Sequence, residues 1–183
     1  MRQIDSLMPQ TSARSPATVD GSPKSQVAPS VEIYSKDKGY VIAVCGTYFI
    51  QILKARLTNT SVSLMRRAVT DLSERHEKFG FLAFNEPEAQ LLMESDIRGG
   101  VSGIVKRFSP CFTGAAIVYE KTGFHATAMR SIVTAINFAS RASHPNQVFA
   151  DLQEGVSWLA KLTPGEPTGT RLMHVVKELR AGL

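Results

Sequence analysis

The sequence predicts an α/β protein with one mixed, mostly parallel sheet of about five strands, entered by an N-terminal hairpin and covered by helices. Short apolar runs alternate along the chain with longer amphipathic segments. The continuous apolar run at 115–119 is typical of a parallel strand covered on both faces. The segment 125–142 repeats apolar residues at three- and four-residue steps, and Thr122 (a side-chain cap) and Gly123 (tolerant of positive φ) supply the turn before it. Residues 112–142 therefore predict the centre of the sheet.

The first third of the chain is expected to hold a leader, a hairpin and one ambiguous segment. Residues 1–30 are rich in Ser, Pro, Thr and Gln and poor in large apolar groups, which predicts disorder. Apolar runs at 31–35 and 40–45, joined through Gly39, predict an antiparallel hairpin. The segment 47–57 can extend the strand, begin a helix or form a partner-binding flap or lid, and packing in the core is the favoured interpretation.

The middle of the chain predicts two helices on either side of a strand. The first helix is expected to start at a cap on Thr60 or Ser61 and to end near residue 78. A strand at 81–84 follows, and a turn through proline leads into a helix over 88–107. Three glycines weaken that helix and indicate a break, a close backbone crossing or a mobile segment. They are Gly99, Gly100 and Gly103.

The last third is expected to complete the domain and to add one helix. A brief strand at 147–150 precedes a helix capped by Asp151, and Trp158 on that helix is expected to pack against the sheet. Residues 163–183 are expected to form a linker and an amphipathic helix. We expect this helix to dock on the domain at 31–162, with docking on another subunit as the alternative.

Composition favours an ordinary globular protein. The 183 residues, 43% of them hydrophobic, suit one domain with tails. The net charge of +5 comes from residues scattered through every segment, which predicts a mildly basic surface and no DNA binding. Cys45 and Cys111 form no CxxC pair and are expected to be reduced and buried. Without a secretory pattern or a long apolar run, the protein is expected to be cytoplasmic with no membrane span.

No local motif predicts an enzyme or a cofactor. The sequence contains neither the P-loop pattern nor a GxGxxG turn after a strand, and GGVSG at 99–103 lacks the spacing of a nucleophile elbow. The histidines are too far apart to predict a metal site. They are His76, His125, His144 and His174. His125 lies where helix amides can receive an anion, and Glu86 and Glu88 form a carboxylate pair, but a polar helix start and helix-dipole compensation are the favoured explanations.

The order of elements, together with VFADLQEGVSWLAKL at 148–162, resembles the STAS-like group, which contains the bacterial anti-sigma-factor antagonists. The resemblance covers about residues 31–162. In phosphoregulated members of the group, a serine lies at a strand-to-helix turn. The matching turn here, at 84–88, contains no serine or threonine, so switching by phosphorylation is not implied, and Glu86 is a constitutive negative charge in that turn.

The resemblance and the lack of catalytic motifs predict a non-enzymatic regulatory module that binds another protein in bacterial signalling, a kinase-like or sigma-regulatory partner being implied by the group. Its predicted surface comprises Glu86, Glu88, Leu91, Thr122, Gly123, His125 and Arg130. The alternative is a carrier or sensor of an apolar or anionic small ligand, a lipid or a nucleotide. A homodimer is left open.

Overall fold

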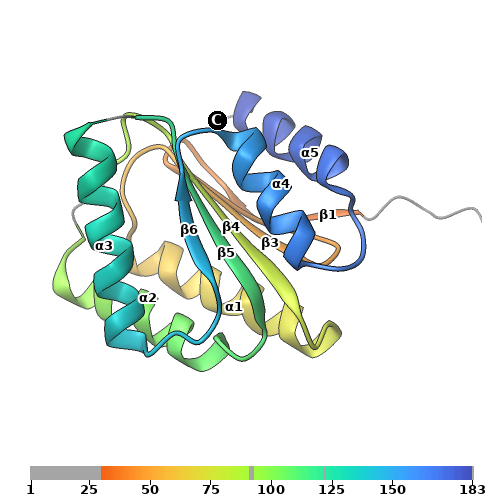
Figure 1. Cartoon of the computed structure of the whole chain (residues 1–183), viewed down its shortest axis with the longest axis horizontal. Coiled ribbons are helices and arrows are strands. Elements are labelled where there is room, and N and C mark those ends of the chain that lie inside the picture. Colours follow the sequence, from red (N-terminus) through yellow and green to blue (C-terminus); the bar gives the residue numbers. More distant parts are fainter. Residues whose placement is uncertain (1–29, 91–92, 122, 183) are drawn as a thin grey trace, which may run out of the picture.

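The computed structural model describes residues 30–90, 93–121 and 123–182, which contain one six-stranded sheet and five helices (Figure 1). The strands are β1 (Val31–Lys36), β2 (Tyr40–Cys45), β3 (Tyr48–Leu53), β4 (Phe79–Asn85), β5 (Phe112–Tyr119) and β6 (Asn146–Phe149). The helices are α1 (Asn59–Arg75), α2 (Ser95–Phe108), α3 (Phe124–Ser140), α4 (Leu152–Leu162) and α5 (Gly169–Ala181). The predicted α/β class with a mixed sheet is confirmed, with six strands where about five were expected.

The strands lie in the sheet in the order in which they occur in the chain. β1, β2 and β3 form an antiparallel meander, and β3 to β6 are parallel. The sixth strand is β3, within the segment 47–57 that the sequence left ambiguous. It is a strand because both its faces are buried: Phe49 and Leu53 pack on one side of the sheet, and Ile50 and Ile52 pack on the other.

The expectation that 112–142 forms the centre of the sheet was wrong. β5 pairs with β4 and β6, so it lies next to the sheet edge, whereas β3 and β4 occupy the middle. The apolar run suggested a central position because both faces of β5 are covered. Coverage by helices on two faces does not require a central place in the strand order.

Helices cover the sheet in two layers. α1, α2 and α3 lie on one face, and α4 and α5 lie on the other (Figure 1). The predicted docking of the last helix on the domain itself is confirmed, because Leu172, Val176 and Leu179 of α5 belong to the same buried cluster as the inward residues of α4. Trp158 packs beside Phe149, with 5.4 Å between ring centroids.

Two predicted helix starts were wrong. α1 is capped by Thr58, and Ser61 is its N3 residue in a reciprocal capping box. α2 begins at Ser95 instead of residue 88. The preceding backbone follows the β3–α1 connection, where the Gln90 amide donates to the Ala55 carbonyl at 2.7 Å, and this contact holds it out of a helix.

The three glycines of α2 lie in an unbroken helix, and one of them marks a close crossing. A Cβ on Gly100 would lie 2.8 Å from Val62 Cγ1 of α1, whereas nothing lies within 4 Å of one on Gly99 or Gly103. Gly123 has the predicted positive φ, at 66°, while Thr122 lies outside the described residues.

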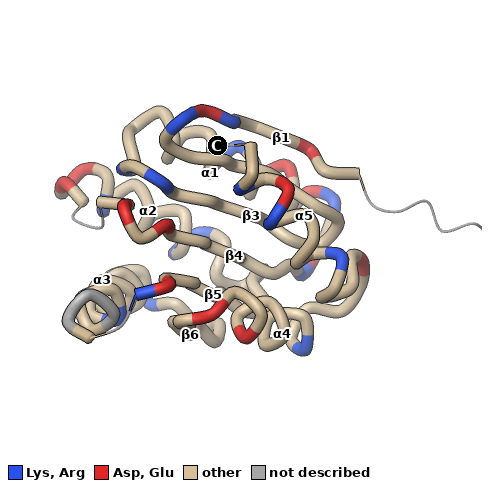
Figure 2. The backbone as a smooth tube through the Cα atoms, turned by 90° about the horizontal axis from the view of Figure 1, so that it is seen from above, with Lys and Arg blue, Asp and Glu red and all other residues tan. Residues whose placement is uncertain are grey.

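Charged residues of both signs are interspersed around the described chain (Figure 2), as the scattered charges of the sequence suggested. No described helix combines the length and apolar character that a bilayer span requires.

Candidate functional site

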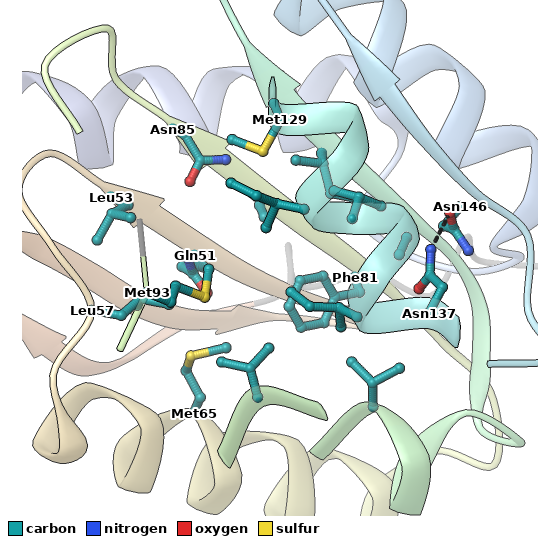
Figure 3. A pocket seen from close by; sticks show the side chains of 18 of the residues that line it. Gln51, Leu53, Leu57, Met65, Phe81, Asn85, Met93, Met129, Asn137 and Asn146 are labelled. Carbon is teal, nitrogen blue, oxygen red and sulfur yellow. Dashed lines mark hydrogen bonds between the residues drawn. The ribbon is translucent and has the colours of Figure 1, made fainter. Parts of the chain in front are cut away.

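An apolar cavity of about 100 Å³ lies between α3 and the sheet (Figure 3). It forms because α3 packs mainly against α2 and leaves its inward residues Ile132, Val133 and Ile136 only half-buried. The residues beneath them on the sheet include Ala83 and Ala115, whose small side chains do not fill the space. The amphipathic pattern of α3 therefore yields the wall of a cavity instead of a closed core.

The walls of this cavity are hydrocarbon and thioether. β3 and the connection after it supply Leu53 and Leu57, and two phenylalanines close the floor. Three methionines from three different segments also line the cavity, and such flexible side chains adapt to irregular shapes. The wall residues named here are Leu53, Leu57, Phe81, Phe112, Met65, Met93 and Met129.

Three polar residues at one end of the cavity satisfy one another. Asn137 Nδ2 donates to Asn146 Oδ1 at 2.6 Å, and Asn146 Nδ2 donates to the His144 carbonyl at 3.4 Å. His144 Nδ1 lies 2.8 Å from Ser109 Oγ, and its ring packs edge-on against Phe112. Burial lowers the pKa of His144 below its ordinary value of 6.5, so the ring is neutral at pH 7.

Two further polar residues come from the middle of the sheet. Gln51 of β3 is only 5% exposed and lines the cavity, and its side-chain amide has no hydrogen-bond partner in the described part of the chain. Asn85 of β4, also 5% exposed, donates from Nδ2 to the Val118 carbonyl at 3.3 Å. Strand alternation aims both side chains toward the α3 layer (Figure 3).

Sequence reasoning missed Gln51. A signal was present, because Gln51 is the single amide in the otherwise apolar or aromatic run YFIQIL. Burying a glutamine in a strand that is covered on both faces costs free energy unless the amide finds a hydrogen-bond partner, in the protein or in a ligand.

The residues predicted as an interaction surface do not all lie free on the surface. Arg180 of α5 donates to both carboxylate oxygens of Glu86 at 2.8 Å, and to Glu120 at 3.4 Å. Its guanidinium carbon lies 4.0 Å from the centroid of the Phe84 ring, and hydrogen bonding to Glu86 raises the pKa of Arg180. Glu86 therefore anchors the last helix.

The other predicted surface residues fall into two groups. Glu88, Gly123 and Arg130 are exposed. Leu91 and Thr122, and the side chain of His125, lie outside the described residues.

Comparison with known proteins assigns neither a family nor a function to the chain. No family model and no curated protein matches the chain. A solved structure described as an uncharacterized protein from DUF3478 family with a SpoIIAA-like fold, from Shewanella loihica PV-4, is similar at 13% identity, covering 72% of this chain and 94% of that one with a TM-score of 0.48. At this identity, nothing about activity carries over to the present chain.

Proposed function

We propose that the protein is a non-enzymatic carrier or sensor that binds a small, mainly apolar ligand between α3 and the sheet. The observation that carries this proposal is the apolar cavity, whose lining combines hydrocarbon walls with a few buried amides. Small-molecule sites typically have this composition, with apolar walls for affinity and a few polar groups for orientation. The amides, thioethers and single neutral imidazole of the cavity lining would bind the ligand without forming a covalent bond to it.

The half-buried face of α3 supports the same function. Ile132, Val133 and Ile136 bury only part of their surface against the protein. A ligand in the cavity would remove the rest from water and would gain roughly 25 cal/mol for each Å² of apolar surface covered. Binding is therefore expected to stabilise α3 against the sheet.

Native mass spectrometry of freshly purified protein tests the proposal together with a cavity-filling variant. Ala83→Leu places three more carbon atoms in the cavity, and Ala135→Leu adds the same atoms to the exposed side of α3. We expect the wild type and Ala135→Leu to carry a co-purifying ligand or to take up small hydrocarbons such as toluene. Folded Ala83→Leu should lose both. Equal ligand uptake by Ala83→Leu and Ala135→Leu would contradict the proposal.

A regulatory protein-interaction role is the second candidate, favoured by the outer face of α3. Phe138 is 87% exposed there, and Arg130 lies exposed on the same helix. A kinase-like or sigma-regulatory partner, a second copy of the chain and a cytoplasmic location stay predictions. Capture of a purified partner should be lost in the Phe138→Asp, Arg130→Glu double variant, which leaves the Glu86–Arg180 contact intact. Unchanged capture would remove this surface from consideration.

A further inference from the structure

The cavity offers no counter-charge to a charged ligand. Among the described lining residues there is no Lys, Arg, Asp or Glu, and the one titratable side chain, His144, is held neutral by burial. An ionised group that entered would lose its hydration and gain no ion pair in return. The lining therefore selects against a carboxylate or phosphate inside the cavity.

Gln51 is a polar residue of the cavity wall that is only 5% exposed, and no described residue hydrogen-bonds to its amide. The amide atoms keep some accessible surface, because the only fully buried side-chain polar atom without a partner in the described part of the chain is Arg171 Nε, which does not line the cavity. The amides of Asn137 and Asn146, at the other end of the cavity, are already paired with each other. The amide of Gln51 has no protein partner at the wall of an apolar cavity, so a hydrogen-bonding group supplied by the ligand would be favourable there.

Asn85 places a second acceptor near Gln51. Gln51 lies beside Ala83 in the parallel register, so Asn85 is two residues further along the neighbouring strand, roughly 8 Å away by strand spacing and rise. Asn85 Nδ2 donates one of its two hydrogens to the Val118 carbonyl, and its Oδ1 has no donor in the described part of the chain. Gln51 and Asn85 can therefore both donate and accept, and Asn85 has one hydrogen fewer to offer.

The size of the cavity limits the apolar part of the ligand. Its volume of about 100 Å³ is of the same order as the roughly 150 Å³ engineered cavity that takes up benzene. A single ring or a short alkyl group fits, while a nucleotide base carrying its phosphates does not suit an uncharged lining.

We infer that the ligand is an electrically neutral molecule with one ring or short alkyl group and one hydrogen-bonding amide, hydroxyl or carbonyl group, which pairs with Gln51. This inference rests on the proposed function and narrows it. Of the ligands considered from the sequence, it keeps the apolar class and sets aside the anionic one. Gln51 is the specificity-determining residue, since it provides a donor and an acceptor that no described residue already uses.

Three probes of similar shape test this inference: toluene, benzamide and benzoate, titrated into the full chain and followed by NMR. Gln51→Leu is the test variant, and Gln153→Leu, on the exposed side of α4, is the matched control. We expect the wild type and Gln153→Leu to bind benzamide and toluene but not benzoate. Gln51→Leu should bind benzamide roughly tenfold more weakly and toluene at least as tightly, because only the hydrogen bond is lost.

Stability supplies a second readout that separates ligand recognition from a structural role. Replacing Gln51, a residue only 5% exposed whose amide no described residue hydrogen-bonds, with leucine should raise the melting temperature of the ligand-free protein by roughly 3 °C. Unchanged benzamide affinity in Gln51→Leu, or tighter binding of benzoate than of benzamide, would overturn the inference and leave the proposed function standing. Failure of all three probes to bind would instead overturn the proposed function itself.

Discussion

The contact between Arg180 and Glu86 predicts that the last helix depends on one side chain. Arg180 makes two hydrogen bonds of 2.8 Å to Glu86, a longer one of 3.4 Å to Glu120, and a cation–π contact with Phe84. The side chains of Arg180 and Glu86 are only 28% and 14% exposed, so water screens their attraction weakly. Arg180→Ala would leave the largely buried Glu86 carboxylate without its cation.

The size of the effect follows from these contacts. Losing two charge-assisted hydrogen bonds at a partly buried site costs about 2 kcal/mol, and the cation–π contact adds about 1 kcal/mol. We therefore expect Arg180→Ala to lower the free energy of unfolding by roughly 3 kcal/mol. For a folded region of this size, the melting temperature should fall by about 9 °C.

Urea unfolding of Arg180→Ala, Arg180→Lys and Glu120→Gln measures this effect. Arg180→Lys keeps the charge but loses the planar fork, so its loss should be intermediate. Glu120→Gln should cost less than 1 kcal/mol, because Glu120 makes only the longer contact and is one-third exposed. An Arg180→Ala protein within 0.5 kcal/mol of the wild type would refute the argument that this cluster anchors α5.

Two further predictions concern pH and helix packing. Because burial depresses the pKa of His144, the unfolded chain binds a proton more readily than the folded one, so stability should fall as pH drops below 6.5. His144→Gln should flatten that fall when urea midpoints at pH 7.5 and 5.0 are compared, and an unchanged pH dependence would contradict the role of His144. Gly103→Ala should stabilise α2 by about 0.5–1 kcal/mol, and Gly100→Ala should destabilise the protein because its Cβ meets Val62; equal effects of the two in thermal melts would contradict the close crossing.

The local features of the fold were readable from the sequence because they depend on neighbouring residues. The hairpin of β1 and β2 and the strand–turn–helix of β5 and α3 follow from hydrophobic period and turn chemistry. The start of α2 could not be predicted from the sequence, because the Gln90 backbone amide donates a hydrogen bond to the Ala55 carbonyl, 35 positions earlier in the chain. Local helix signals cannot report such a contact.

The cavity could not be predicted from the sequence either, because it depends on contacts between residues that are far apart in the chain. The repeat of Ile132, Val133 and Ile136 predicts that α3 has an inward face, but it does not say how far that face lies from the sheet. That distance depends on the small residues Ala83 and Ala115 beneath it, on two other elements. Glu86, predicted at a binding surface, also pairs with Arg180, 94 positions away, and no local pattern indicates that contact.

Methionine methyl groups offer the most direct test of the cavity as a binding site. With [methyl-¹³C]methionine protein, the signals of Met65, Met93 and Met129, which line the cavity, can be compared with that of Met173, which is buried on the opposite face of the sheet. On titration with toluene, the account predicts saturable shifts of the three cavity signals and none of Met173. Unmoved cavity signals, or a shift of Met173 as large as theirs, would contradict a ligand site between α3 and the sheet.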